Sequence, residues 1–285
     1  MPSLRENYYQ LTIFVLSLSY RPEIMENKTG ICLQPFIPLR LAASERSEMI
    51  TQILFGELFI IKEHQKESGF SYIINENDKY EGWVDDKTIK YITQKERESI
   101  LSYPAKIVTS REYRVVDTYK NEMWLSAGSI LRIEPGNNIY GTLSMYSPGL
   151  NEYSPREIFE QAAGEWVNVA YIWGGKTTFG TDCSGMVQNI YKQAGIDIPR
   201  DSQQQAEMGK NVNFIFESQP GDLAFFSNEE GIITHVGMIL SGNRILHASG
   251  KVRIDLFDQQ GIYSREKGNY THKLRLMRNL VNGEG

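Results

Sequence analysis

Residues 171–185 read YIWGGKTTFGTDCSG, and this stretch decides the fold of the C-terminal part of the chain. Its aromatic and glycine-rich start predicts a loop, and Asp182 is a residue type that caps helices. Apolar residues then recur at helical spacing, and Gly195 fits the C-terminal end of the helix. These residues are Met186, Val187, Ile190, Tyr191 and Ala194. Cys183 therefore lies at the helix N-terminus, whose partial positive charge favours the thiolate.

A packing role is the alternative for Cys183, because a free cysteine is most often a small buried hydrophobe. Its sequence position alone does not separate the two roles. Cys32 lies between Ile31 and Leu33 on a predicted strand and is assigned to packing. Two cysteines in unlike contexts do not make a disulfide framework, so the fold depends on its hydrophobic core.

The segments around this stretch complete an α+β domain over residues 151–285. Upstream, residues 154–157 (SPRE) form a capping box with a proline at the first helical position. Downstream, Asp201 is expected to cap a third, short helix that ends near Gly209. Later segments that read as strands are Leu223–Ser227, Ile232–Leu240, Arg244–Ala248 and Lys273–Arg278. Helices first and sheet second are typical of an α+β domain.

Two histidines flank a predicted hairpin turn at residues 241–243 (SGN). A three-residue loop would pair Leu240 with Arg244. His235 and His247 would then lie on one face as diagonal neighbours, roughly 7–8 Å apart. A two-residue turn would place the two rings on opposite faces. The catalytic interpretation therefore depends on the three-residue loop.

A nucleophile, a base and a residue that orients the base are one interpretation of Cys183, His235 and His247. Zinc also accepts cysteine and histidine, but the short ligand spacings of zinc sites are missing. Catalysis without a metal or an organic cofactor is therefore favoured. The other two histidines, His64 and His272, lie in polar stretches and are expected to be solvated.

Short strand-like runs fill residues 31–92 and 106–146, separated by polar or glycine-containing turns. In the first set they are Ile31–Leu41, Ile50–Lys62, Gly69–Asn75 and Gly82–Tyr91. Turn signals in the second set are Ala127-Gly128, residues 135–138 and Pro148-Gly149. This spacing suggests small antiparallel barrels, and both sets resemble bacterial SH3-like modules. A generic all-β region remains the alternative for the second set.

The composition is that of a globular protein, with 41% hydrophobic and 23% charged residues and a formal charge of −5. No basic run with interleaved aromatic residues appears, so we expect no nucleic-acid partner. The apolar run at residues 11–20 is too short to span a membrane and lacks a small-residue cleavage site. We therefore expect residues 1–24 to be a non-native or disordered extension upstream of a start at Met25, with a signal peptide as the alternative.

Four strings of the C-terminal part resemble the motif set of NlpC-type peptidoglycan cysteine peptidases, namely YIWGGKTTFGTDCSG, PGDLAFFS, ITHVGMIL and ILHAS. Upstream, FIPLR, TQILFGE and YEGWV resemble the subfamily of dipeptidyl-peptidase VI, a γ-D-glutamyl-L-diamino-acid endopeptidase. The resemblance runs from about Met25 to the end. It implies an α+β fold with a papain-like NlpC-type peptidase domain at 151–285. Two small SH3-like β-barrels, at 25–97 and 98–150, would precede it.

The resemblance also implies a role for single residues. It makes Cys183 the nucleophile, His235 the general base and His247 the residue that orients the base, and Tyr171 would hold the scissile carbonyl or its oxyanion. Substrate-binding residues would be Asp182, Ser184, Asp201 and Ser202, together with Glu57 and Tyr80 from the first SH3-like domain. Trp173 is kept as an aromatic core residue.

The implied activity is cleavage of the γ-D-glutamyl-L-diamino acid bond in peptidoglycan stem peptides with a free N-terminal L-alanine. Such peptides arise in recycling, so the expected location is the cytoplasm, with export as the alternative if residues 1–24 act as a signal. A non-catalytic peptidoglycan-binding module is one alternative function. An amidase or acyltransferase acting on another amide is a second, since one fold hosts several chemistries. The sequence does not indicate which diamino acid is preferred.

Overall fold

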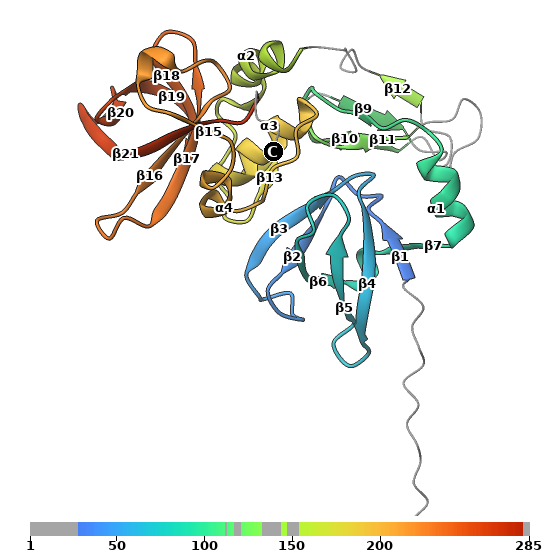
Figure 1. Ribbon diagram of the computed structural model, residues 1–285. Helices are drawn as coiled ribbons and strands as arrows, with labels where there is room; N and C mark the ends of the chain where they lie inside the picture. Colours follow the sequence, from blue (N-terminus) through green and yellow to red (C-terminus); the bar gives the residue numbers. More distant parts are fainter. Residues whose placement is uncertain (1–27, 112, 117–120, 133–143, 147–153, 282–285) are drawn as a thin grey trace, which may run out of the picture.

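The computed structural model describes residues 28–111, 113–116, 121–132, 144–146 and 154–281. Two β-rich units and a helix-and-barrel unit follow one another along the chain (Figure 1). The predicted turns at residues 135–138 and 148–149 and the predicted extension at 1–24 lie outside the described residues.

The first unit is a seven-stranded antiparallel sheet in the order β3-β2-β6-β5-β4-β1-β7. Its strands are β1 (Lys28–Ile31), β2 (Phe36–Arg40), β3 (Met49–Leu54), β4 (Leu58–Gln65), β5 (Phe70–Asn75), β6 (Glu81–Asp85) and β7 (Lys90–Ile92). A 3-10 turn, η1 (Asp86–Thr88), joins the last two strands. Alternating residues point inward, and the buried core contains Ile37, Leu39, Ile53, Phe59 and Cys32. The packing role predicted for Cys32 is therefore confirmed.

A helix that the sequence analysis missed, α1 (Gln94–Leu101), joins the first and second units. Thr93 caps it, and Glu96 completes a capping box, which is the signal that could have found it. The second unit has two small sheets, ordered β10-β9-β12 and β11-β8. Their strands are β8 (Lys106–Ile107), β9 (Tyr113–Val116), β10 (Glu122–Leu125), β11 (Ile130–Leu131) and β12 (Ser144–Tyr146). The predicted turn at Ala127-Gly128 is present.

The C-terminal unit begins with helices. They are α2 (Pro155–Trp166), α3 (Cys183–Gln193) and α4 (Ser202–Ala206), with the short hairpin β13 (Lys176–Thr177) and β14 (Gly180–Thr181) before α3. Ser154 and Glu157 form the predicted capping box of α2. Gly195, at a φ of 76°, follows the end of α3 as predicted.

The strands that follow close into a barrel, because β21 pairs with β16 on one side and with β20 on the other. They are β15 (Lys210–Val212), β16 (Leu223–Ser227), β17 (Ile233–Leu240), β18 (Arg244–Ser249), β19 (Lys251–Asp258), β20 (Gly261–Ser264) and β21 (Asn269–Asn279), with a 3-10 turn η2 (Ile215–Glu217) before β16. The predicted strands correspond to β16, β17, β18 and part of β21. Strands β15, β19 and β20 were not predicted.

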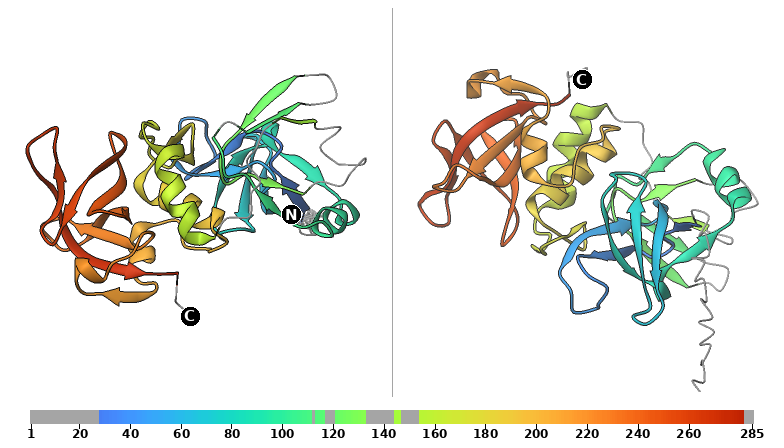
Figure 2. Two further views of the ribbon diagram at one scale, coloured as in Figure 1. Left: turned by 90° about the horizontal axis from the view of Figure 1, so that it is seen from above. Right: turned by 60° about the horizontal axis from the view of Figure 1, so that its bottom comes forward.

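Helices α2 and α3 lie between this barrel and the N-terminal units, as both views in Figure 2 show. Helix α3 packs on β17 and β18, and α2 packs on α3. Phe159, Trp166, Val187, Ile190 and Met238 meet in the buried core between helices and strands. This packing fixes the start of α3 against β17 and β18, the strands that carry His235 and His247.

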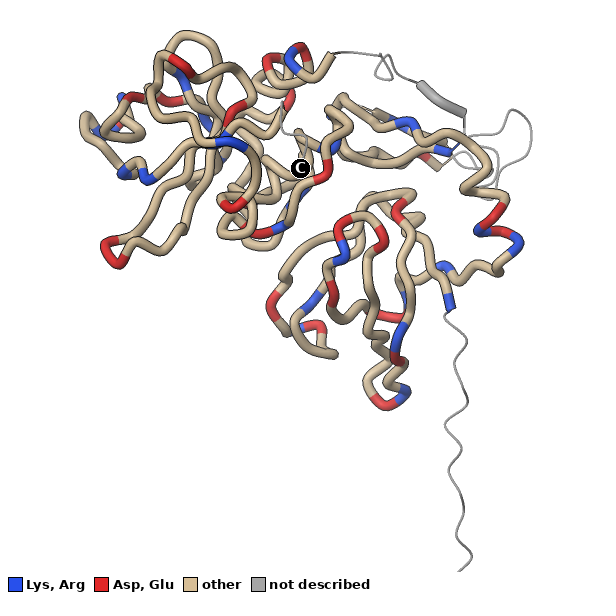
Figure 3. The backbone as a smooth tube through the Cα atoms, viewed as in Figure 1, with Lys and Arg blue, Asp and Glu red and all other residues tan. Residues whose placement is uncertain are grey.

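Both N-terminal units touch the C-terminal unit. Gln52 of β3 accepts a hydrogen bond from the Lys176 backbone, and Asn189 of α3 donates to the backbone oxygen of Ala127. Charges of both signs are interspersed along the chain (Figure 3). None of the helices in the described residues has the length and apolar character needed to cross a membrane.

Candidate active site

Cys183 is the first residue of α3, and Asp182 caps that helix, as the sequence predicts. The Asp182 carboxylate accepts hydrogen bonds from the backbone N–H groups of Gly185 at 2.7 Å and Gly174 at 2.9 Å. A Cβ atom at Gly185 would lie 2.1 Å from the backbone oxygen of Gly175. Glycine is therefore needed at 185 because the preceding loop approaches it.

His235 on β17 and His247 on β18 face one another across the predicted hairpin. Leu240 pairs with Arg244, which confirms the three-residue loop, and His247 lies opposite Gly237. Nε2 of His235 is 3.0 Å from Nδ1 of His247, within hydrogen-bonding distance. The diagonal placement predicted from the loop length is thus what brings the two rings into contact.

A carboxylate that the sequence analysis missed extends this pair. Asp255 on β19 accepts a hydrogen bond from Nε2 of His247 at 3.1 Å. Arg253 forms an ion pair with the same carboxylate, its Nε lying 2.7 Å from Oδ2. The pairing of His247 with Arg253 across β18 and β19 makes Asp255 a diagonal neighbour of His247. Since β19 was not predicted, no sequence signal linked the two.

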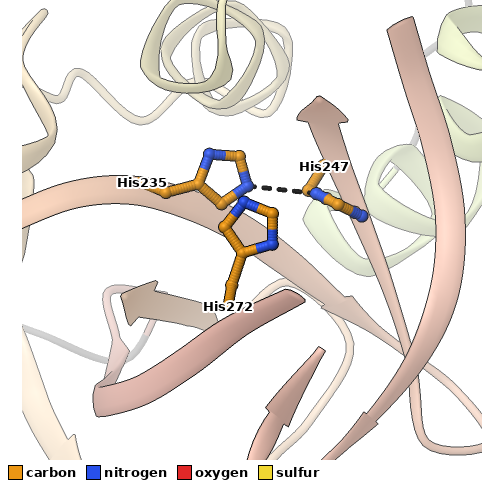
Figure 4. Close-up of side chains that lie close together, drawn as sticks. All are labelled: His235, His247 and His272. Atoms are coloured by element: carbon orange, nitrogen blue, oxygen red, sulfur yellow. Dashed lines mark hydrogen bonds between the residues drawn. The ribbon is translucent and has the colours of Figure 1, made fainter. Parts of the chain in front are cut away.

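His272 on β21 is a second missed residue, and the prediction that it is solvated is wrong. Its ring stacks on that of His235, with centroids 4.3 Å apart and an interplanar angle of 25°. Figure 4 shows the imidazoles of His235, His247 and His272 gathered from three strands. Burial lowers the pKa of His272 to about 4, so its ring is neutral near pH 7.

The three histidines also merit comparison with a metal site, since one ring nitrogen from each lies within 4.8 Å of the others. A metal ion lies close to the plane of each imidazole that binds it. The nearly parallel rings of His235 and His272 do not share such a position, and a nitrogen of His235 is engaged with His247. The arrangement therefore favours acid–base chemistry over metal binding.

The electrostatics of Cys183 differ from the prediction. Burial raises the pKa of its thiol to about 11, and the nearby Asp182 carboxylate adds to the rise. Backbone hydrogen bonds from Val236 and Ser184 act in the opposite direction. Burial also holds the pKa of His235 well below its usual value, and the adjacent His272 and His247 lower it further. Near pH 7 the thiol of Cys183 and the imidazole of His235 are therefore both neutral.

A cavity of about 440 Å³ opens at Cys183 and contains most of the predicted substrate-binding residues. They are Tyr80, Asp182, Ser184, Asp201 and Ser202, and Tyr171 lines the cavity with them. Burial raises the pKa of Tyr171 to about 12, so its hydroxyl stays protonated near pH 7. The hydroxyl can therefore donate a hydrogen bond to an oxyanion. Tyr171 and Cys183 line the same cavity, and the oxyanion role of Tyr171 stays a prediction.

Two domains meet at one wall of the cavity. The Tyr80 hydroxyl, from the first sheet, donates to both carboxylate oxygens of Asp201, at 3.3 and 3.2 Å. Asp201 occupies the N-cap position of α4 but makes no side-chain cap bond. Its carboxylate bonds Tyr80 at the cavity wall instead, so the side-chain cap predicted for Asp201 is not formed.

Glu57 is not part of this cavity, which corrects the prediction. It is fully buried, and its carboxylate accepts from Lys192 at 2.5 Å and from the backbone of Leu54 at 2.9 Å. Lys176 lies 3.7 Å from the same carboxylate and 3.1 Å from that of Asp78. Glu57 thus belongs to a buried charge cluster that joins the first sheet to α3.

Glu48 and Trp173 occupy the cavity wall instead. The Trp173 indole donates to Glu48 at 2.5 Å, and both side chains line the cavity. Trp173 is 64% exposed, so its assignment to the core is wrong. Glu48 directly precedes β3, and only the docking of the first sheet onto the peptidase unit shows that it faces the site.

Arg200 is a further residue whose role the sequence analysis missed. It is 2% exposed, and it binds both carboxylate oxygens of Asp182, at 3.0 and 2.5 Å. Its other N–H groups donate to Ser184, Thr51 and the Gly175 backbone. All five donors of its guanidinium are engaged within the protein, so Arg200 holds the helix cap in place.

A cysteine at a helix N-terminus and a histidine pair on the strands against which that helix packs are the groups expected of a cysteine-type hydrolase. The NlpC/P60 family matches residues 168–271, and the bacterial dipeptidyl-peptidase Sh3 domain matches residues 39–89. The chain therefore contains an NlpC/P60 domain that is preceded by a bacterial dipeptidyl-peptidase Sh3 domain.

Individual relatives agree with this assignment. The chain is similar to the gamma-D-glutamyl-L-lysine dipeptidyl-peptidase of Bacillus subtilis, with 28% identity over 80% of this chain and 82% of the relative. It is 34% identical to the murein DD-endopeptidase MepS/murein LD-carboxypeptidase of Escherichia coli K12, over 41% of this chain and 61% of that protein. An NlpC/P60 family protein from Bacillus cereus has the same fold, with a TM-score of 0.71 and 18% identity over 89% of this chain and 99% of that one.

Proposed function

We propose that the protein hydrolyses the bond between γ-D-glutamate and a diamino acid in peptides that begin with a free L-alanine. The observation that carries the proposal is the wall of the cavity formed by Glu48, Tyr80 and Asp201. The charges of Asp182 and Arg200 offset each other, which leaves the carboxylates of Glu48 and Asp201 as the uncompensated charges of the lining. Two carboxylates suit a cationic peptide amine, which is costly to bury without partners.

The first sheet supplies Glu48 and Tyr80, so this wall exists only while that sheet lies against the peptidase unit. A substrate peptide extended beyond its alanine would clash with this wall. A peptide with a free N-terminal amine would place that amine against the wall. The similar Bacillus subtilis protein is named for γ-D-glutamyl-L-lysine, which supports the choice of bond.

The chemistry follows from the arrangement of the groups. His235 takes the thiol proton, and the sulfur of Cys183 attacks the γ-carbonyl of D-glutamate. The Tyr171 hydroxyl and the backbone N–H at the start of α3 stabilise the oxyanion, a contribution of about 3–4 kcal/mol per donor. The imidazolium of His235 then protonates the leaving amine, and water hydrolyses the acyl-enzyme.

The test compares L-Ala-γ-D-Glu-L-Lys and its meso-diaminopimelate counterpart with the same peptides N-acetylated. We expect cleavage of the free peptides only, followed by mass spectrometry. Glu48→Gln and Asp201→Asn should each lower kcat/KM by about 10- to 150-fold, since a hydrogen bond to a charged group is worth about 1.5–3 kcal/mol. Glu45→Gln, whose side chain pairs with Lys87 outside the cavity, is the matched control. Equal rates on free and acetylated peptides would contradict the proposal.

Peptides with a free L-alanine have already been released from the glycan strands. We therefore propose a role in recycling within the cytoplasm. Fractionation of the native cells, with the activity followed on the free peptide, tests this location.

A further inference from the structure

The side chains that follow the catalytic base form a chain of hydrogen bonds that ends at a carboxylate. Nε2 of His235 meets Nδ1 of His247 at 3.0 Å, and Nε2 of His247 meets Asp255 at 3.1 Å. His247 is 1% exposed and Asp255 is 7% exposed, so water does not compete freely for these bonds. All three side chains come from adjacent strands of the barrel.

We propose that Asp255 is a positioning residue that sets the tautomer of both histidines. An ionised carboxylate only accepts hydrogen bonds, so Nε2 of His247 must carry a proton. Nδ1 of a neutral His247 is then a bare acceptor, and Nε2 of His235 must donate to it. Nδ1 of His235 is left unprotonated, as the atom that takes the proton of Cys183. This inference rests on the proposed peptidase chemistry for Cys183 but not on the identity of the peptide.

Arg253 keeps Asp255 in the required state. Its Nη2 donates to Oδ1 of Asp255 at 3.2 Å, while its Nε lies 2.7 Å from Oδ2. Burial alone would raise the pKa of Asp255, but the hydrogen bonds from His247 and Arg253 outweigh it and hold the pKa below its ordinary value. Nη1 of Arg253 also pairs with Glu266 at 3.0 Å, which fixes the guanidinium.

The proton steps balance within this arrangement. The S–H bond of Cys183 breaks as an N–H bond forms at Nδ1 of His235, and the imidazolium stays hydrogen-bonded to His247. It then gives the proton to the leaving amine. Asp255 itself gains no proton. It only accepts the hydrogen bond from Nε2 of His247 and so keeps the proton on that nitrogen.

The arrangement predicts an unusual order of variants. In Asp255→Asn the amide oxygen will face the donors of Arg253, and the amide N–H will face Nε2 of His247. That reverses the tautomer of His247 and then of His235, whose Nδ1 becomes protonated and cannot act as a base. In Asp255→Ala neither tautomer is imposed. Asparagine should therefore be more harmful than alanine, the reverse of what a purely structural role predicts.

The experiment measures kcat and KM on the free peptide and, separately, the rate of Cys183 alkylation by iodoacetamide. Asp255→Asn should lower kcat about 10²- to 10⁴-fold with little change in KM, as expected for loss of general-base catalysis. Its alkylation rate near pH 7 should also fall below that of Asp255→Ala, and should recover at high pH as the thiol ionises without a base. Asp258→Asn, on the same strand, is the matched control and should behave like the unmodified protein.

A second variant guards against a simple folding defect. Adding Arg253→Met to Asp255→Asn removes the donors that orient the amide, so the amide oxygen can turn to His247 and activity should partly return. The titratable groups beside His235 that can shift its pH profile are His247 on β18 and His272 on β21. Cys183 on α3 lies against the same strand, since the backbone N–H of Val236, the residue after His235, hydrogen-bonds its sulfur. Alanine as harmful as asparagine, or no recovery in the double variant, would overturn the proposal. Alkylation does not involve a peptide, so failure of the proposed substrate would show only in turnover.

Discussion

Replacing Arg200 with methionine should destabilise the protein by about 3–5 kcal/mol, the usual cost of breaking a buried ion pair. The guanidinium is 2% exposed, and Asp182, which it binds through two nitrogens, is 5% exposed. Methionine retains much of the apolar volume. The loss therefore comes mainly from the Asp182 carboxylate, which would be left buried without its cation.

Urea denaturation followed by tryptophan fluorescence measures this cost. With an m value of about 3 kcal/mol/M, the midpoint should fall by about 1–1.7 M. Lys87→Met is the matched control, because the lysine side chain is 78% exposed and its pairs with Glu45 and Asp85 are screened by solvent, so the midpoint should stay almost unchanged. Asp182→Asn added to Arg200→Met should recover most of the loss, since asparagine still caps the helix without a charge. A cost below about 1 kcal/mol, or no recovery in the double variant, would refute the reasoning.

Three further predictions concern the catalytic groups. Cys183→Ala and His235→Ala should each abolish turnover without moving the thermal midpoint by more than a few degrees. His247→Asn should be milder, because an amide can accept a hydrogen bond from His235 and donate one to Asp255. Near-normal turnover in His235→Ala would show that the base is wrongly assigned. Since burial lowers the pKa of His235, the base stays neutral in mild acid, and the acid limb of kcat/KM should lie below pH 6.5; a limb at or above that value would contradict the pKa shift. In His235→Ala, alkylation of Cys183 should keep rising between pH 7 and 10, because burial raises the thiol pKa to about 11, and a plateau near neutral pH would rule this out.

The parts of the site that could be predicted are those set by local geometry. The cap at Asp182 and the turn at residues 241–243 each depend on a few adjacent residues, and they place Cys183, His235 and His247. The motif strings added the order of these groups along the chain. Local rules were sufficient because each of these side chains lies on an element next to the turn or cap that positions it.

Asp255 and His272 could not be found in this way, because their positions depend on strand pairings that close the barrel. Strand β19 pairs with β18, and β21 returns to pair with β16 and β20. Side chains alternate between the two faces of a strand, so the face on which a given side chain lies cannot be predicted until the register of the strand is known. His272 was taken as solvated because its neighbours in sequence are polar, yet its ring stacks on His235 inside the site.

Glu48 lines the cavity, whereas Glu57, which the sequence analysis places there, does not. The two residues lie at opposite ends of β3, and the docking of the first sheet gives each a different environment. Glu48 precedes β3 and Glu57 follows its end, and six strand residues span about 20 Å. One end meets the charge cluster with Lys192, which joins the first sheet to α3, and the other end closes the cavity beside Trp173. The sequence indicates that both positions are acidic, but only the contact surface decides which carboxylate is neutralised by lysines. Because β3 links the two residues, the contact that holds the first sheet against α3 also positions the Glu48 carboxylate at the cavity.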